Sequence, residues 1–518
     1  MSGMGPAAVE VEEEEETLAR RKRRLLSNAA YLGGGHGDER DATRGRRVTI
    51  EDLPMEVLQD VFAACVARAG GAVPTAPRLA CVSRTFRDAI RRAPEMFWVD
   101  IDMSSGFCAP TDGKVKTMCA TGAWRSARSI NFSGCGKLTD ATLRVIGAEC
   151  PGVRDLTFSG GKFTKAGLEH LARRGGFRSI AMDLTNPKLT PSDALLALRA
   201  FIVHSSDTLE RVSCGRDAPY SPSERRAFTN ASTQLFNDLK KCANLKVMDF
   251  TNCGEDVRFP LYDLQRLCPH VEELRLNYFG GDPGWSIVGH APVDFEDTCW
   301  RKLRVCEVAV AMETTSVGYR LGRSNIDDAG LIAILYGSIE TIQVLDVTGC
   351  SHLGNWSSVI WDTLPNNLVE LRCARTPLAG DRAVHHVLAH LCPALEHLEL
   401  SCVGAAATHV TDDAFALFAP GTGPPLALQT LGVAGSAVTE RALRTLVSSA
   451  PGARFPRLRF IDVTACRALS RTVRRVATDG ASVAARDNVR ALDRALRDAS
   501  AADASATDPG PPPRLSRE

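Results

Sequence analysis

The sequence lacks a strong net charge, a long apolar run and an export signal. Its 62 basic and 61 acidic residues leave a net charge of +1, so no global field favours nucleic acid or a membrane surface. No apolar stretch approaches the ~18 residues that span a bilayer, and the N-terminus has no apolar signal-peptide core. We therefore expect an intracellular protein, cytoplasmic or nuclear, with no nucleic-acid or membrane partner.

Motifs of chemistry are missing as well. No two of the 17 cysteines stand in C-x-x-C spacing, which disfavours a zinc site, and their odd number and wide spread are typical of a reducing compartment. No glycine-rich nucleotide-binding motif follows a strand-like segment. His386-x-x-x-His390 lacks the acidic residue of a zinc-protease helix. The sequence therefore predicts a non-enzymatic protein with no catalytic residue, metal or cofactor.

The length of 518 residues exceeds what one compact core usually holds, about 250–300 residues, so several domains or a repeated architecture are expected. Residues 1–46 combine an acidic run (Glu12–Glu16) with a basic run (Arg20–Arg24) and few large apolar residues, which predicts disorder. The basic run is either a nuclear-import signal or a solvated charge cluster. Residues 480–518 predict one helix followed by a disordered tail.

Residues 124–479 contain a repeated pattern. The spacing apolar-x-x-apolar-x-apolar recurs about twelve times at intervals of roughly 24 to 39 residues. Each copy continues with apolar residues three or four apart after a polar helix start, such as Thr139, Thr411 or Thr439. One copy is thus a strand, a turn and a helix, and stacking the copies buries their leucines behind a parallel sheet. The expected fold is an α/β solenoid.

Cysteines at 135, 253, 350 and 466 follow the predicted strands at one common offset. In this respect the repeats resemble the cysteine-containing subclass of leucine-rich repeats. The resemblance implies a horseshoe of about twelve strand-helix repeats, with its parallel sheet on the concave face.

Residues 47–103 follow a different pattern. Pro54 suits a first helical turn, and the spacing of Val57, Leu58, Val61 and Phe62 gives the following helix one apolar face. Glycines and prolines between residues 70 and 77 break this helix, and a second helical run covers residues 79–90. We assign residues 104–123 to a linker or cap between this module and the repeats.

This module resembles the F-box. Leu53-Pro54-x-Glu56-Val57-Leu58-x-x-Val61-Phe62 matches the family's first motif, whereas the second motif has Ser83 for cysteine and Phe86 for tryptophan, and Phe97-Trp98 replaces Leu-Trp. The resemblance implies three helices that bind a Skp-type adaptor and, through it, a cullin. The adaptor-binding residues implied by the motif are Leu53, Pro54, Leu58, Val61, Phe62, Val82, Phe86 and Trp98. Alternatively, the same apolar side chains form the module's own core or dock it on the first repeat.

A target protein is expected on the concave surface, where the polar residue between the last two apolar positions of each strand points away from the helices. The candidate positions are Asp249, Arg275, Glu307, Asp346, Arg372 and Glu399. Two interpretations are open: an acidic face that captures a basic segment, or a ladder of opposite charges that neutralises itself. The second is favoured because both arginines stand between acids.

A long insertion between residues 278 and 300 adds three aromatic residues. Trp285 is a candidate contact with the target, because insertions in a solenoid often bind partners. The aromatics can also fold back to cover the extra backbone, which we expect for Trp300 because it lies next to Leu303.

The combination of an F-box-like module and leucine-rich repeats suggests the substrate-recognition subunit of an SCF-type (Skp-cullin-F-box) ubiquitin ligase. The module would bind the adaptor, and the solenoid would bind an unidentified target protein for degradation. The alternative is a leucine-rich interaction scaffold that carries an F-box-like cap and recruits no ligase. Adaptor binding discriminates between the two hypotheses.

Overall fold

The chain divides after Pro54 into two compact units. The computed structural model describes residues 49–68, 72–104, 110–183, 188–215, 222–251, 259–277, 299–310, 312–315, 318–321, 326, 328–351, 353, 366–388, 392–401, 410–448 and 453–506. In the first unit these include one short 3-10 helix, η1 (Ile50–Asp52). A capping box closes it, since the backbone N–H and Oγ1 of Thr49 both donate to Asp52 Oδ2, at 2.7 and 2.9 Å. The tail predicted for residues 1–46 lies outside the described residues, and so do residues 507–518 of the C-terminal segment, 480–518, that we predicted as a helix and a tail.

The second unit begins with helices α2 (Met55–Arg68), α3 (Ala72–Val82), α4 (Arg84–Arg92) and α5 (Pro94–Phe97). We expected three helices, with residues 79–90 in one of them. This was wrong, because residues 79–82 end α3 and residues 84–90 belong to α4. Ser83 divides them: its Oγ accepts a hydrogen bond from the backbone N–H of Phe86 at 3.2 Å and so begins a new helix.

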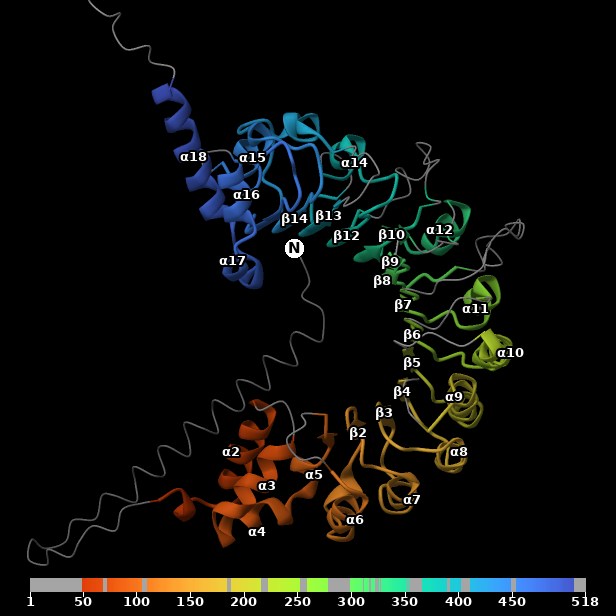
Figure 1. The fold of residues 1–518 in the computed structure, drawn as a ribbon. Coiled ribbons are helices and arrows are strands. Elements are labelled where there is room, and N and C mark those ends of the chain that lie inside the picture. Colours follow the sequence, from red (N-terminus) through yellow and green to blue (C-terminus); the bar gives the residue numbers. More distant parts are fainter. Residues whose placement is uncertain are drawn as a thin grey trace, which may run out of the picture. The chain divides into compact units, whose positions relative to one another are not determined.

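Thirteen strands then form one parallel sheet in chain order, visible side by side in Figure 1. They are β1 (Asp100–Asp102), β2 (Ser129–Phe132), β3 (Asp155–Phe158), β4 (Ser179–Asp183), β5 (Arg211–Gly215), β6 (Val247–Asp249), β7 (Glu273–Arg275), β8 (Val305–Glu307), β11 (Val344–Asp346), β12 (Glu370–Arg372), β13 (His397–Glu399), β14 (Thr430–Gly432) and β15 (Phe460–Asp462). A separate antiparallel pair, β9 (Met312–Thr315) and β10 (Gly318–Leu321), lies in an insertion. The twelve predicted strands and the α/β solenoid are confirmed, and β1 adds a strand from residues that we assigned to the helical module.

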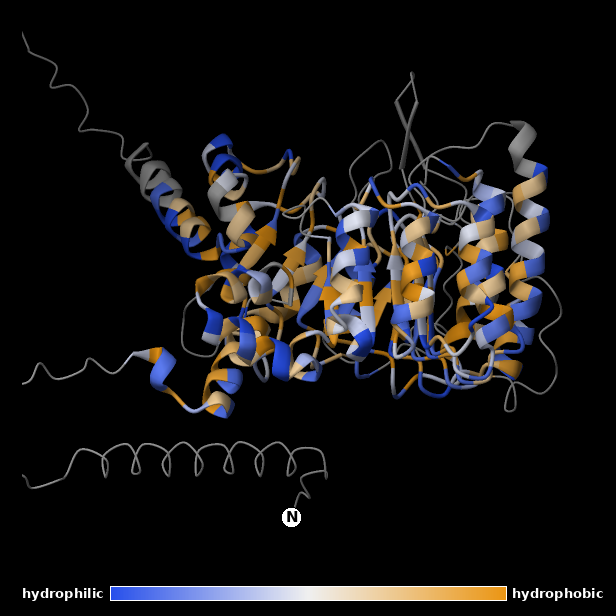
Figure 2. Ribbon diagram, turned by 90° about the horizontal axis from the view of Figure 1, so that it is seen from below, coloured by the Kyte–Doolittle hydropathy of each residue, from blue (hydrophilic) through white to orange (hydrophobic). Residues whose placement is uncertain are grey.

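Helices alternate with these strands. They are α6 (Asp112–Ala120), η2 (Ala123–Ser126), α7 (Asp140–Glu149), α8 (Lys165–Ala172), α9 (Pro191–Ser205), α10 (Pro222–Leu239), α11 (Leu261–Leu267), α12 (Asp328–Leu335), α14 (Asp381–His386), η6 (Asp412–Phe418), α15 (Glu440–Leu446), α16 (Arg471–Ala477), α17 (Gly480–Ala485) and α18 (Val489–Ala506). Thr139 and Thr439 cap α7 and α15 as predicted, whereas Thr411 caps a 3-10 helix. Figure 2 shows hydrophobic residues along the strands and mixed hydrophobic and hydrophilic residues along the helices.

Neighbouring repeats are joined by a recurring aspartate–threonine pair. Asp112, the first residue of α6, accepts hydrogen bonds from the backbone N–H and Oγ1 of Thr139, the residue that caps α7, at 2.9 and 2.7 Å. The same bonds link Asp140 to Thr164, Asp381 to Thr411 and Asp412 to Thr439. Each aspartate also lies near the positive end of its own helix. The pair therefore stabilises both a helix start and the stacking of two repeats.

The repeat cysteines make a second link. After three strands the thiol donates to a carbonyl oxygen of the preceding repeat: Cys135 to Met103 at 3.5 Å, Cys350 to Val308 at 3.3 Å and Cys466 to Val433 at 3.2 Å. All three are buried. Burial raises the pKa of the Cys466 thiol, which keeps it protonated and able to donate. The fourth cysteine of this set, Cys253, lies outside the described residues.

Asn488 closes the C-terminal edge of the sheet. Its backbone N–H donates to the carbonyl of Arg459 at 2.9 Å, as a further strand would. Its side chain accepts from the N–H of Ile461 at 2.9 Å and donates to the carbonyl of Ile461 at 2.8 Å. One side-chain amide thus pairs both backbone groups of Ile461 in β15, so this edge residue offers no template for another strand. The following helix α18 buries Leu492 and Leu496.

Candidate protein-interaction surfaces

Burial separates the eight residues predicted to bind an adaptor. Those that are buried in the second unit are Leu58, Phe62, Phe86 and Trp98. Val61 is 37% exposed and Val82 is 66% exposed. Leu53 and Pro54, which belong to the first unit, are half-buried and exposed, respectively.

The buried members form the core of the helical module. The rings of Phe62 on α2 and Phe86 on α4 lie 4.6 Å apart between centroids, and Leu58 is completely buried. Gln59 Nε2 also donates to the carbonyl of Ala89 at 3.0 Å, which ties α2 to α4. These residues pack the module from within, as our alternative interpretation describes, and their contact with an adaptor stays a prediction.

A second stripe of α2 stays accessible. Val57, Val61 and Cys65 are spaced four residues apart and therefore share one side of the helix. Val57 is half-buried, and Val61 and Cys65 are exposed. Val82 adds an exposed side chain at the last residue of α3. We call Val57, Val61, Cys65 and Val82 the apolar stripe.

The departures from the F-box pattern have structural roles. Ser83, which replaces a cysteine, caps α4, and Phe86, which replaces a tryptophan, packs on Phe62. The N-cap preference of serine was the signal that the sequence offered for the first of these roles.

The candidate target-binding residues lie on the inner face, defined here as the face of the sheet opposite the repeat helices. In β6–β8 and β11–β13 the middle residue is buried toward the helices, and the first and third residues point to the inner face. Strand pairing puts the third residues in one row, in the order Asp249, Arg275, Glu307, Asp346, Arg372, Glu399. The predicted set is therefore brought together, apart from Trp285, which lies outside the described residues.

Two further carboxylates, which the sequence analysis missed, stand at the first positions of β7 and β12 and pair with the arginines of this row. Arg275 contacts Glu273 at 2.6 Å and Glu307 at 3.4 Å. Arg372 forms ion pairs with Glu370 and, at 3.5 Å, with Asp346. The neighbouring carboxylates Glu370 and Asp346 raise the pKa of Arg372, although burial by itself lowers it. The predicted ladder of opposite charges exists, but each arginine is shared by two acids.

The acids at the strand ends also close the following turns. A side-chain oxygen accepts a hydrogen bond from the N–H two residues later: Asp249 from Thr251 at 3.1 Å, Asp346 from Thr348 at 2.9 Å and Asp462 from Thr464 at 2.9 Å. This is the local turn that aspartate favours. In the sequence, this turn is indicated by the serine or threonine that stands two residues after the acid.

Trp300 is fully buried, and its indole N–H donates to the carbonyl of Cys268 at 3.0 Å. The residue is thus directed into the core, while the insertion backbone that we expected it to cover (residues 278–298) lies outside the described residues. Trp300 therefore cannot anchor a partner.

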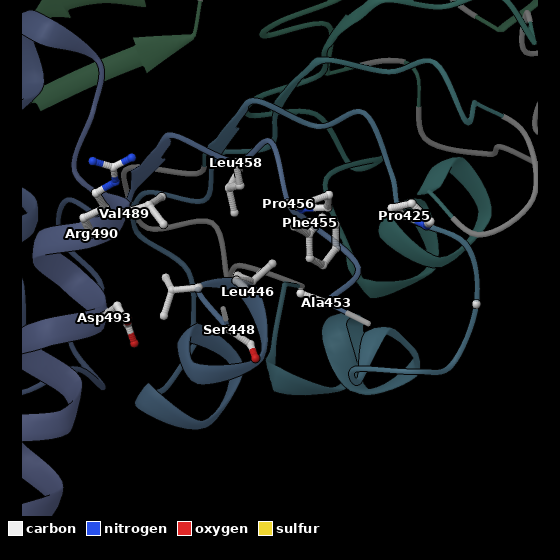
Figure 3. A pocket seen from close by; sticks show the side chains of 12 residues that line it. Pro425, Leu446, Ser448, Ala453, Phe455, Pro456, Leu458, Val489, Arg490 and Asp493 are labelled. Carbon is white, nitrogen blue, oxygen red and sulfur yellow. The ribbon is translucent and has the colours of Figure 1, made fainter. Parts of the chain in front are cut away.

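A cavity of about 600 Å³ lies near the C-terminal end of the sheet, between the end of α15 and the start of α18 (Figure 3). Its lining includes Leu446, Phe455 and Leu458, with Arg490 and Asp493 from α18. Arg490 and Asp493 are the ionisable residues of its lining. Within the described ranges, no group of three His, Cys, Asp or Glu residues is placed to hold a metal ion.

The repeats define the class of protein: an α/β solenoid of the leucine-rich-repeat type, with one parallel sheet and a helical module before it. Among the helices in the described parts of the chain, none has both the length and the hydropathy that a bilayer span requires.

No family model matches this sequence. No curated protein matches it either. Among solved structures, it is similar to a chain in the crystal structure of the Rad7 and Elc1 complex in yeast, with 15% identity over 91% of this chain and 96% of that chain, and a TM-score of 0.40. A chain in the crystal structure of the TLR13–ssRNA13 complex is 12% identical over 67% of this chain and 50% of that chain, with a TM-score of 0.28. These similarities are too distant to assign a function.

Proposed function

We propose that this protein is the substrate-recognition subunit of an SCF-type ubiquitin ligase. The helical module binds a Skp-type adaptor and, through it, a cullin, while the solenoid holds the target protein. The observation that carries the proposal is the apolar stripe. Three of its residues lie on α2, the helix that matches the F-box motif, and Val82 ends α3; both helices precede the leucine-rich-repeat sheet.

The apolar stripe supports adaptor binding because it is separate from the module's core. Residues four apart on α2 form two adjacent rows: Leu58, Phe62 and Val66 are buried, whereas Val61 and Cys65 are exposed. Exposed apolar side chains beside a well-packed core are the usual form of a helical docking site. The buried row holds the helices together so that the exposed row keeps its shape.

The solenoid has the properties that target positioning needs. Aspartate–threonine pairs and thiol–carbonyl bonds join several pairs of neighbouring repeats, which favours a fixed inner face. In this function the chain contributes proximity: it holds a target lysine near the ubiquitin-conjugating enzyme that the ligase recruits. Partners carry out the transfer of ubiquitin.

A pull-down with a purified Skp-type adaptor tests the proposal on the full chain. The test variant is Val61→Asp with Val82→Asp, which puts charge on the apolar stripe and leaves the core intact. Substituting Leu58 would be uninformative, because a charged group in the core would unfold the module. The matched control is Val203→Asp with Leu417→Asp, since these residues are exposed by 43% and 54% on repeat helices.

Retention of the wild type and the control, with loss of the test variant, is the expected result. If a folded wild type is not retained, or the test variant is retained as well as the control, the ligase role fails. The chain would then be an interaction scaffold with an F-box-like cap.

A further inference from the structure

The inner face repeats its own side-chain pattern. Strands β6, β7 and β8 read Val-Met-Asp, Glu-Leu-Arg and Val-Cys-Glu, and strands β11, β12 and β13 read Val-Leu-Asp, Glu-Leu-Arg and His-Leu-Glu. On the inner face the two triplets differ only where His397 replaces Val305. Strand pairing joins β8 to β11 directly, with Val305 opposite Val344. Two equivalent units, which we call the first and second triplet, therefore lie side by side.

Each triplet has an excess of negative charge. The first triplet holds Asp249, Glu273 and Glu307 against one guanidinium, Arg275, and the second holds the corresponding three acids against Arg372. One arginine balances one carboxylate, so each triplet keeps a formal charge of about −2. The ion pairs orient the arginines and leave this excess on the inner face.

At the third strand position, the charged residues of the described sheet are those of these six strands, together with Asp102 in β1 and Asp462 in β15. In β2, β3, β4 and β5 the corresponding residues are uncharged: Asn131, Thr157, Ala181 and Ser213. At the junction of the two triplets the first positions are occupied by Val305 and Val344, which are half-buried. Apolar side chains between carboxylates suit the methylene stem of a lysine or arginine whose charged end reaches the acids.

We propose that the inner face of β6–β8 and β11–β13 binds an extended basic segment of the target protein, with one cationic side chain at each triplet. This inference rests on the proposed role of the solenoid as a target receptor. Equivalent positions in the two triplets are three strands apart, or ~14 Å at ~4.8 Å per strand. An extended chain advances ~3.4 Å per residue, so the two cationic residues stand about four positions apart.

The test is a fluorescence-anisotropy titration of the full chain with two labelled, end-capped peptides made of glycine, serine and two arginines. In one peptide the arginines are four positions apart, and in the other they are adjacent. Asp249→Asn with Glu307→Gln neutralises the first triplet, and Asp346→Asn with Glu399→Gln neutralises the second. Both variants keep the ion pair between the glutamate and arginine of the central strand. Glu169→Gln with Asp193→Asn is the control, because it removes two carboxylates from α8 and α9.

The spaced peptide should bind several-fold more tightly than the adjacent one. Each triplet variant should weaken its binding about 5-fold, in line with the loss of two carboxylates from the inner face, of which Asp346 is buried against Arg372. The control should bind like the wild type, and added salt should weaken binding.

No binding, equal affinity for both peptides, or equal losses in the control would overturn the inference. Replacement of the chain's own basic run, Arg20–Arg24, by glutamines provides another check. Much tighter peptide binding after this change would identify that run as the occupant and overturn the assignment to a target. The adaptor pull-down separates the two proposals: a chain that retains the adaptor but ignores both peptides loses this inference and keeps the receptor function.

Discussion

Replacement of Asn488 should open the C-terminal end of the sheet. The side chain is 1% exposed and makes three hydrogen bonds with backbone groups: it accepts from Ile461 N–H at 2.9 Å, and donates to the carbonyls of Ile461 at 2.8 Å and Ala477 at 3.2 Å. Asn488→Ala leaves these groups without a partner. Each buried, unpaired backbone group costs about 1–3 kcal/mol, so the three together amount to about 3–9 kcal/mol, and we expect a local loss of at least about 2 kcal/mol.

Because repeat proteins unfold locally, the measurement should be local as well. Hydrogen exchange followed by mass spectrometry reports on the amide of Ile461 in β15. A loss of 2 kcal/mol corresponds to about 30-fold faster exchange. Strands β2 to β5, far along the sheet, should exchange as in the wild type. Asp487→Ala is the matched control, because Asp487 is the exposed neighbour of Asn488.

Asn488→Asp provides a sharper test. An ionised carboxylate still accepts from Ile461 N–H but repels the two carbonyls, so its pKa in the folded protein must be raised. The destabilisation is then complete above that raised pKa and decreases as pH falls through it, because the protonated acid can donate one hydrogen bond. Unchanged exchange at Ile461 in Asn488→Ala, or no pH dependence in Asn488→Asp, would refute the edge-closing role.

Three further predictions concern the helix starts. Burial opposes ionisation of Asp112, but hydrogen bonds from Thr142 and Thr139 outweigh it and lower the pKa of this carboxyl. Its contribution to stability is therefore present above its ordinary pKa and is lost as pH falls through the lowered value. Asp112→Asn should flatten the acid limb of a series of thermal-unfolding measurements at different pH. Ser83→Ala should cost about 1 kcal/mol in urea unfolding of the helical module, while Ser83→Thr should cost less. Thr439→Val should lose the Oγ1 bond to Asp412 and the cap of α15, lowering stability by about 1–2 kcal/mol and exposing α15 to proteolysis, whereas Thr439→Ser should behave like the wild type.

The sequence predicted the repeats well because their spacing is a direct consequence of packing. In the pattern apolar-x-x-apolar-x-apolar, the last two apolar side chains must face the helices. Twelve strands could therefore be placed from the residues alone. The strand β1 fits the same spacing, with Trp98, Ile101 and Met103 at the apolar positions, but it was assigned to the preceding module because Phe97-Trp98 was interpreted as the last F-box motif. Ser83 was hidden in an apparently continuous apolar spacing, although its capping bond divides α3 from α4.

The candidate surfaces were less predictable, since burial depends on packing between distant segments. The F-box motif identified both rows of α2 but could not separate Leu58, in the core, from Val61, at the surface. On the inner face we considered one position per strand and therefore missed Glu273 and Glu370. These two residues change the charge balance of the face. The duplication of the triplets became visible only when strand pairing had put them in register.

The hydrogen-bonded thiols of the repeats have a practical consequence for chemical labelling. Of the described cysteines, Cys65 and Cys81 are exposed, and both belong to the helical module, whereas Cys135, Cys350 and Cys466 are enclosed between repeats. After replacement of Cys108, Cys253 and Cys402 by serine, a maleimide reagent should label the module first. Since Cys65 lies on the apolar stripe, protection of this thiol from the reagent would report the docking of a partner. The buried thiols of the solenoid would stay unlabelled during the measurement.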